Sequence, residues 1–274
     1  MSKLKVLYAV SEIDPFLPSS PARHFVKELA RYVQTQNVEV RIIAPKFGLI
    51  NDRKNRLHEV VRLSGSSIFV GEEDKPVLIK VASIPSAKLQ VYFIDNEDLF
   101  KRKALFHDKE GNFFKDNDDR IVFFCRGVLE TVRKLDWSPD VVHCHGWITS
   151  LIPLYLKTAY RQEPVFQNAR VVYTAYEDPA EQMFNADFKK KITMPGISSS
   201  ALKNLAEPSV QNLVLTAMRH ADEAVCAENV SEDQLQRLNT ALPKRKQAVQ
   251  MVHQGDAGIA HYHALYQRLG GSNA

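Results

Sequence analysis

Short apolar runs alternate with amphipathic segments along most of this chain. The strand-like runs lie at residues 6–10, 38–44, 139–146, 170–174 and 223–226. Segments with apolar residues at helical spacing lie at 25–34, 118–135, 149–159 and 209–220. Strands and helices that alternate in this way are typical of a parallel sheet covered by helices.

The pattern changes between residues 57 and 94, where short β-like pieces are separated by glycine, proline and polar residues. These pieces lie at 60–63, 67–70, 77–81 and 89–94. We interpret them as an inserted β-meander whose last strand rejoins the main sheet. Residues 100–117 and 184–204 have no clear period and are predicted to be long loops. The fold predicted is a single Rossmann-like α/β domain with a mostly parallel sheet.

Composition narrows the class of protein without changing this fold. The chain has 274 residues, 45% of them hydrophobic, and a net charge of +4, which is too small to indicate nucleic-acid binding. Its three cysteines are far apart, which favours reduced thiols over disulfides or a zinc site. No apolar run approaches the ~18–20 residues that span a bilayer, and no signal peptide precedes the first strand. We expect a cytoplasmic protein without a membrane segment, cofactor or metal.

Polar residues follow several of the predicted strands. Ligands of open parallel sheets bind beyond the carboxyl ends of the strands. Glu12 follows the first strand, and His145 and Trp147 stand where the strand-like run at 139–146 ends. Taken alone, Glu12 is either a turn residue or a site residue, and Trp147 is either a core anchor or a platform on which a sugar stacks.

His143 and His145 point to the same side of their strand, because alternate strand residues share a face. By spacing alone they are structural histidines, sugar or phosphate contacts, or metal ligands, and a metal would need further ligands that the sequence does not offer nearby. Asp116, Asn117 and Arg120 stand where the helix at 118–135 begins. They form either a helix cap with a surface pair or part of a site.

Several segments resemble the N-terminal half of bacterial glycogen synthases and plant starch synthases (glycosyltransferase family 5). Residues 5–16, KVLYAVSEIDPF, are similar to the family's KVLFVASEaaPF. Residues 115–130, KDNDDRIVFFCRGVLE, are similar to sDNaxRFxxFsxAaLe, and residues 137–157, WSPDVVHCHGWITSLIPLYLK, to WxPDVVHaHDWhtaLvPvyLK. The resemblance extends over roughly residues 3–230. It implies one half of a GT-B fold, in which two Rossmann-like domains face a cleft.

The family reaction moves glucose from ADP- or UDP-glucose to an α-1,4-glucan with retention. By resemblance, His145 would contact the donor sugar in a degenerate catalytic site, and Glu12 would touch the acceptor. The substrate-binding residues implied in addition are Asp116, Asn117, Arg120 and Trp147.

The first loop departs from the family, whose pattern is Phe-x-Lys-Thr-Gly-Gly-Leu-Gly-Asp-Val. Here Pro18 stands for the lysine, Ser20 and Pro21 for the paired glycines, and Arg23 for the later glycine. In the family the lysine and the glycine amides help to hold the nucleotide sugar and the product diphosphate. Because proline has no amide proton, we expect binding of nucleotide-glucose to be lost.

The resemblance also predicts the domain boundaries of the chain and its function. The family's nucleotide-binding C-terminal domain is expected to be absent, while residues 260–269, AHYHALYQRL, are similar to the family's last helix. We therefore predict a synthase N-terminal-like domain at residues 1–254 and a helix at 255–274 that packs back on it. The protein is expected to be a glycogen/starch synthase-like pseudoenzyme with little or no activity alone, or one that needs a partner chain. The alternative is a non-catalytic module that binds α-glucan or malto-oligosaccharide, or that regulates or docks a partner.

Overall fold

A computed structural model describes residues 3–18, 21–84, 87–177, 182–251 and 255–271. Its strands are β1 (Lys5–Val10), β2 (Glu39–Pro45), β3 (His58–Glu59), β4 (Ser66–Val70), β5 (Glu73–Ile84), β6 (Leu89–Asp95), β7 (Val141–His145), β8 (Arg170–Ala175), β9 (Glu223–Ala227) and β10 (Val249–Met251). They are ordered β10-β9-β8-β7-β1-β2-β6-β5-β3, with β4 paired to β5. The strands from β10 to β6 are parallel, and β5 is antiparallel to its three neighbours. The predicted α/β fold with a mostly parallel sheet is confirmed.

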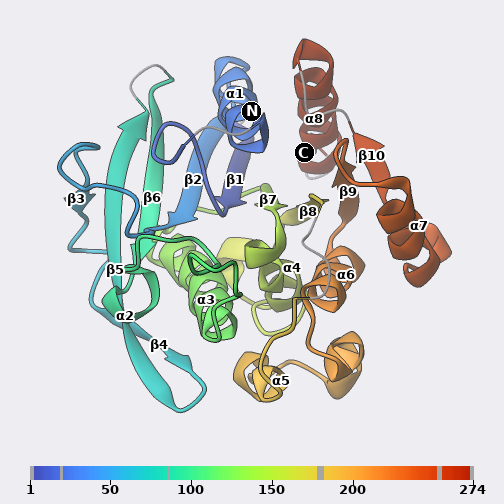
Figure 1. The fold of residues 1–274 in the computed structure, drawn as a ribbon. Coiled ribbons are helices and arrows are strands. Elements are labelled where there is room, and N and C mark those ends of the chain that lie inside the picture. The colour runs from blue at the N-terminus through green and yellow to red at the C-terminus, as the bar shows by residue number, and fades with distance from the viewer. Residues whose placement is uncertain (1–2, 19–20, 85–86, 178–181, 252–254, 272–274) are drawn as a thin grey trace.

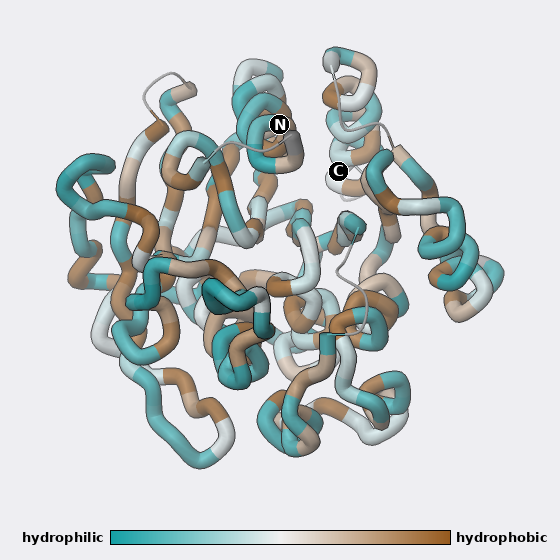
Figure 2. The backbone as a smooth tube through the Cα atoms, in the orientation of Figure 1, coloured by the Kyte–Doolittle hydropathy of each residue, from teal (hydrophilic) through white to brown (hydrophobic). Residues whose placement is uncertain are grey.

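The central strands form the core because helices cover both faces of the sheet. In β1, every residue from Val6 to Val10 is at most 1% exposed, and all of β7 is buried. Strands buried on both faces read as continuous apolar runs, which is why the sequence pattern located them. Each such aliphatic or aromatic side chain contributes roughly 1.5–3 kcal/mol when it leaves water. Figure 2 shows these hydrophobic stretches in the middle of the molecule and hydrophilic ones along the outer loops.

Two helical layers flank the sheet. The α-helices are α1 (Pro21–Thr35), α2 (Glu97–Phe100), α3 (Asn117–Leu135), α4 (Leu151–Lys157), α5 (Phe188–Ile192), α6 (Val210–His220), α7 (Glu232–Ala241) and α8 (Gly255–Gly270). The 3₁₀ helices are η1 (Trp147–Thr149), η2 (Pro164–Phe166), η3 (Ser199–Ala206) and η4 (Lys244–Lys246). Helices α1 and α8 lie together on one face, and α3, α4 and α6 pack on the other (Figure 1).

The meander lies at one end of the sheet. Strand β6 pairs in parallel with β2, as predicted for the strand that rejoins the sheet, and it also pairs with the long strand β5. The prediction of a strand at residues 60–63 is wrong, because these residues turn back between β3 and β4. Backbone bonds from Leu63 and Ser64 to the Val60 carbonyl close that turn.

Two other local predictions need correction, and some elements were not predicted at all. Residues 184–204 are not a plain loop, since they contain α5 and much of η3. Both helices are too short for a 3.6-residue period to show in the sequence. The helix predicted at residues 149–159 is divided between η1 and α4. Helix α7 and strand β10 were not predicted, and β10 contributes only three residues to the sheet.

Helix α8 lies beside α1 and contacts β7. Its buried side chains include Ile259, Tyr262, Leu265, Tyr266 and Leu269. These residues form the apolar stripe that the sequence shows at helical spacing. Residues 272–274, at the end of the segment predicted as a helix, lie outside the described residues.

Candidate functional site

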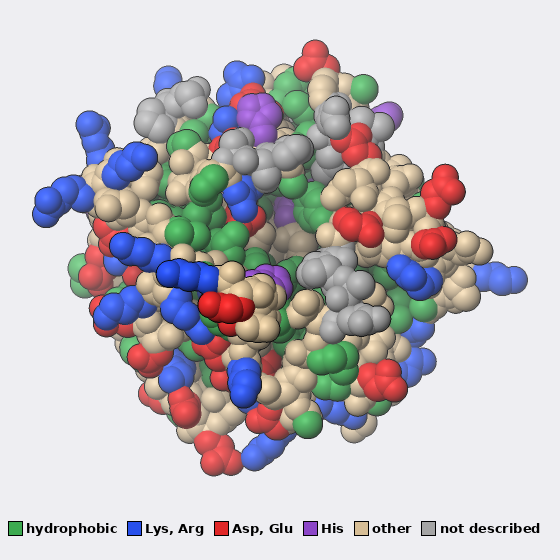
Figure 3. Space-filling model, viewed as in Figure 1, with side chains coloured by type: hydrophobic (Ala, Val, Ile, Leu, Met, Phe, Trp, Pro, Cys, Tyr) green, Lys and Arg blue, Asp and Glu red, His purple; other side chains and the backbone are tan. Residues whose placement is uncertain are grey.

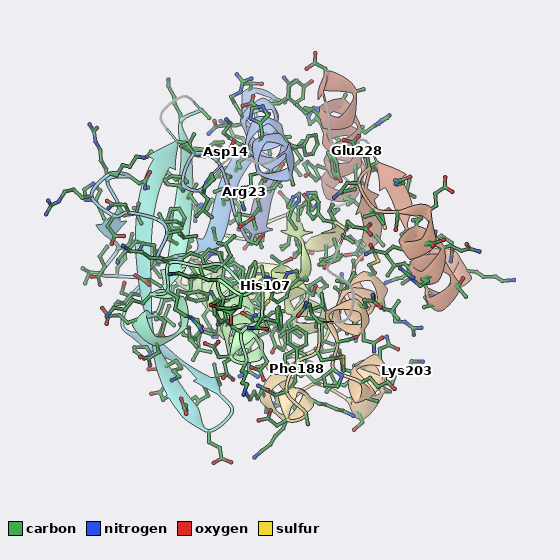
Figure 4. All side chains as sticks on the ribbon, in the orientation of Figure 1. Asp14, Arg23, His107, Phe188, Lys203 and Glu228 are labelled. Carbon is green, nitrogen blue, oxygen red and sulfur yellow. The ribbon has the colours of Figure 1, made fainter. Side chains whose placement is uncertain are left out.

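A cavity of about 250 Å³ opens beyond the carboxyl ends of β1, β7 and β8. It is lined by Val10, Ser11, Glu12, Ala22, Arg23, Val26, Phe106, His145, Gly146, Trp147, Tyr176, Glu177 and Asn229. Figure 3 shows the molecule hollowed at the centre of this face, with a histidine deep in the hollow. Figure 4 places Arg23 above it and His107 below it, so α1 and the segment after α2 border the opening.

An ion pair between Glu12 and Arg23 spans one wall of this cavity. Glu12 follows β1, and Arg23 lies in the first turn of α1. Arg23 Nη2 lies 2.6 Å from Glu12 Oε1, and Nε donates to Oε2 at 2.7 Å, with each side chain 16% exposed. Nη1 of Arg23 donates to the carbonyl of Pro18. Two-point pairing of this kind fixes both side chains more tightly than a single contact does.

Burial dominates the electrostatics of Glu12. Burial raises the pKa of Glu12 above its ordinary value, although the hydrogen bond and the charge of Arg23 act in the opposite direction. Among the described residues, the other charged side chain that lines the cavity is Glu177, which accepts a hydrogen bond from the Ser231 amide at 2.7 Å. With both carboxylates ionised and one guanidinium, the described residues of the cavity wall carry a formal charge of −1.

His145 lies at the end of β7 and reaches the cavity. Its Nδ1 atom lies 2.8 Å from Tyr176 Oη. Burial raises the pKa of Tyr176, so this phenol stays protonated at neutral pH and can donate to the imidazole. The ring centroid of His143, two residues earlier, lies 3.8 Å from that of His145 with the ring planes tilted by 36°, but His143 does not line the cavity. Of the two histidines considered from the sequence, His145 lines the cavity and His143 is buried behind it.

Gly146 makes the turn that brings His145 and Trp147 to the cavity. Its φ of 75° and ψ of 171° belong to a region that only glycine adopts readily. The Gly146 amide donates to the carbonyl of Thr174 at 3.0 Å, which ties the end of β7 to β8. Gly146 stands where the family pattern WxPDVVHaHDW has an aspartate. At this backbone conformation a residue with a side chain would be strained.

Trp147 lies in an aromatic cluster at the lower edge of the cavity. Its ring centroid lies 4.6 Å from that of Phe106, 5.6 Å from Phe113 and 6.1 Å from Phe184. Trp147 is half-buried and lines the cavity. It thus anchors part of the core and still presents surface to a ligand, so both interpretations of Trp147 fit its position.

Asp116, Asn117 and Arg120 do not line this cavity. Asn117 and Arg120 are 1% and 0% exposed, and Asp116 pairs with Arg102. Arg120 Nη1 donates to the Leu105 carbonyl and to Asn117 Oδ1. Asn117 and Arg120 bond to the segment at residues 101–116, which includes Asp116 and carries Phe106 to the cavity. A direct contact of these residues with substrate stays a prediction.

Sequence reasoning placed Tyr176 and Glu177 beyond a strand end, where ligands bind, but it missed the cavity residues Arg23, Phe106 and Asn229. Arg23 stands at a position that the family fills with glycine, and that substitution was the available signal. Within the described ranges, no group of three or more His, Cys, Asp or Glu side chains is arranged to hold a metal ion. None of the helices in the described part of the chain is both long and apolar enough to cross a bilayer.

Comparison with known proteins shows the family to which the chain belongs. The family model described as "Starch synthase catalytic domain" matches residues 5–241. The glycogen synthase of Chlorobium luteolum is 37% identical over 258 residues, which are 94% of this chain and 51% of that protein. The glycogen synthase of Pelodictyon phaeoclathratiforme is 39% identical over 85% of this chain and 48% of its own length. The chain therefore spans about half the length of the curated relatives it matches.

A solved structure has the same fold. The catalytic domain of starch synthase IV from Arabidopsis thaliana, solved with ADP and acarbose, superposes with a TM-score of 0.74 at 18% identity. The match covers 92% of this chain and 52% of that one. With a family match over residues 5–241, this chain belongs to the starch synthase catalytic domain family of glycosyltransferases.

Proposed function

We propose that this chain supplies the acceptor-facing half of an α-glucan glucosyltransferase site, and that these residues alone bind glucan without transferring glucose at a useful rate. The observation that carries the proposal is the ion pair of Glu12 with Arg23 at the cavity wall. In the family pattern the same loop offers a lysine and glycine amides to a diphosphate. Here its one guanidinium is held by a carboxylate.

The balance of charge in the cavity supports a neutral ligand. A diphosphate needs unopposed cations or backbone amides around it. Two nitrogens of Arg23 are engaged by Glu12, and Pro18 replaces the family's lysine. A cavity wall with a formal charge of −1 would repel a nucleotide diphosphate in this partly buried setting.

The lining also suits a sugar. Sugar rings have apolar faces and hydroxyl edges, so their sites combine aromatic surface with a few fixed polar groups. Phe106 and Trp147 provide the aromatic surface. Around them, Glu12, His145, Tyr176 and Asn229 provide the hydrogen-bonding groups. We assign Glu12 and Trp147 to the acceptor, and we place His145 where the transferred glucose would lie.

Glucose transfer by this site requires a nucleotide-binding domain to close over the cavity. We propose that a second polypeptide or domain provides that part, with ADP- or UDP-glucose as the donor. That second polypeptide or domain would also have to supply the positive charge that the first loop lacks. Glucose transfer depends mainly on electrostatic stabilisation of the leaving diphosphate. In the absence of that supply, the chain acts as a glucan-binding module.

Calorimetric titration of the purified chain with maltoheptaose, ADP-glucose and UDP-glucose tests the proposal, with a glucose-transfer assay run in parallel. We expect binding of maltoheptaose, no binding of either nucleotide sugar, and no turnover. His145→Gln should weaken maltoheptaose binding, whereas His58→Gln, an exposed control, should not. Turnover by the chain alone would contradict the proposal that these residues do not transfer glucose at a useful rate. Absence of maltoheptaose binding would leave only a docking function for this face.

A further inference from the structure

The segment between α2 and α3 presents one aromatic ring to the cavity. Residues 101–116 contain no helix or paired strand apart from a single bridge between His107 and Phe113. Phe106 directly precedes the bridge residue His107 and lines the cavity. Its ring meets Trp147 edge to face, with centroids 4.6 Å apart and planes at 62°. The two contacting rings line the same cavity as His145.

Two buried polar side chains of α3 hold this segment in place. Arg120 Nη1 donates to the Leu105 carbonyl at 2.5 Å, and Asn117 Nδ2 donates to the Phe106 carbonyl at 2.9 Å. Arg120 also donates to Asn117 Oδ1 at 2.7 Å, so the two side chains support each other across one turn of α3. Two consecutive carbonyls are thus fixed by residues one turn apart, which sets the backbone position of Phe106.

Packing alone does not explain Arg120. The side chain is fully buried, and its Nε and Nη2 atoms have no hydrogen-bond partner in the described part of the chain. Its guanidinium carbon lies 5.3–5.8 Å from four phenylalanine ring centroids, those of Phe47, Phe100, Phe106 and Phe114. Burial lowers the pKa of Arg120 to about 10, which reflects the cost of a charge in this place. A buried and incompletely bonded charge is costly, so its position over the Phe106 backbone calls for a role beyond filling space.

We propose that Phe106 contacts a glucosyl unit of the bound α-glucan, and that Arg120 is the positioning residue that holds Phe106 in place for this contact. The inference rests on the proposed glucan binding of the same cavity. It adds a binding residue that the sequence did not indicate. It also gives Arg120 an indirect role in place of direct contact with substrate.

Maltoheptaose titrations of single and double variants test both parts. Phe106→Leu should weaken binding about tenfold, because an aromatic contact with a ligand ring typically accounts for that much affinity. Phe106→Tyr keeps the ring and should bind like the parent. Phe69→Leu, at a site 62% exposed in β4, is the matched control and should leave binding unchanged. Thermal melting of each variant separates lost contact from lost folding.

A double-mutant cycle isolates the positioning role of Arg120. Arg120→Lys should weaken binding several-fold in the parent and should add no further loss in the Phe106→Leu background. A merely structural role would lower the melting temperature in both backgrounds without this coupling in affinity. Equal binding by the parent and Phe106→Leu would overturn the inference and leave the proposed function intact. A parent that does not bind maltoheptaose would overturn both, and additive losses in the cycle would overturn the role of Arg120.

Discussion

Nδ1 of His143 lies 2.5 Å from Oη of Tyr266, so a central strand and the last helix of the chain are joined by a buried hydrogen bond. The second ring nitrogen of His143 lies 2.8 Å from Thr174 Oγ1, and Thr174 in turn lies 3.1 Å from Tyr262 Oη. All four side chains are buried. Helix α8 is therefore held to β7 and β8 by specific polar contacts as well as by its apolar stripe.

Removing one hydroxyl should reveal the strength of this attachment. Tyr266→Phe keeps the ring but deprives buried His143 of a partner, which should lower the free energy of unfolding by about 1–3 kcal/mol. Urea denaturation measures the change. Tyr32→Phe is the matched control, because Tyr32 is 37% exposed and its replacement should change stability by less than about 0.5 kcal/mol. Equal stability of the two variants would contradict a structural role for the His143–Tyr266 bond.

The Glu12–Arg23 pair makes stability depend on pH in a defined direction. Burial raises the pKa of Glu12 above its ordinary value of 4.5, so between that value and its folded pKa the native state holds a proton that the unfolded chain has lost. Stability falls with rising pH wherever the native state binds more protons. The contribution of Glu12 is therefore complete below pH 4.5 and declines as the pH passes through its folded pKa.

Two variants separate this contribution from the rest of the protein. Glu12→Gln cannot titrate, so its unfolding free energy should lack the decline that Glu12 causes. Arg23→Met removes the opposing charge and hydrogen bond, so the pKa of Glu12 should rise further and the decline should extend to higher pH. Denaturation measured from pH 4 to pH 8, together with NMR titration of the carboxyl group, reports both. An unchanged pH profile in Glu12→Gln would show that Glu12 is not the group responsible.

The contact with Tyr176 should fix the tautomer of His145. Because Tyr176 stays protonated, its hydroxyl can donate to Nδ1 of His145 at 2.8 Å, which leaves the proton of the neutral ring on Nε2. In Tyr176→Phe the imidazole should populate both tautomers, visible in the ¹⁵N shifts of its ring nitrogens. The His143 ring, held by Tyr266 and Thr174, should keep its shifts and serves as an internal control. Unchanged His145 shifts would mean that Tyr176 does not set the tautomer.

The main elements of the fold could be predicted because their patterns are local. Strand β1 and strand β7 are short apolar runs, and α3 shows its helical period over five turns. The short helices α5 and η3 left no such pattern. Strand β10 escaped prediction because three residues at the edge of a sheet have no distinctive alternation.

The candidate site was predicted only in part, since proximity across the fold does not show in local sequence. Glu12, His145 and Trp147 were found because they follow strands, where ligands of parallel sheets bind. Asp116, Asn117 and Arg120 also stand near a helix start, but the loop before α3 folds over them and carries Phe106 to the cavity instead. The pairing of Arg23 with Glu12 depends on how the first loop bends, which composition does not reveal.

An ion network between Lys191 and the first turn of α3 offers a last test. Lys191 Nζ lies 2.9 Å from Asp118 and 2.8 Å from Asp119, and the Asp118 side chain is fully buried. Burial lowers the pKa of Lys191, but the hydrogen bonds and charges of the two aspartates outweigh it and raise the pKa well above the ordinary value.

Lys191→Met would leave a buried carboxylate without its cation and should lower the free energy of unfolding by about 3–5 kcal/mol. Lys190→Met, next to it in α5, removes an exposed pair with Glu72 and should cost less than about 1 kcal/mol. Chemical denaturation compares the two variants, and similar losses would mean that the network around Asp118 contributes no more than a surface ion pair.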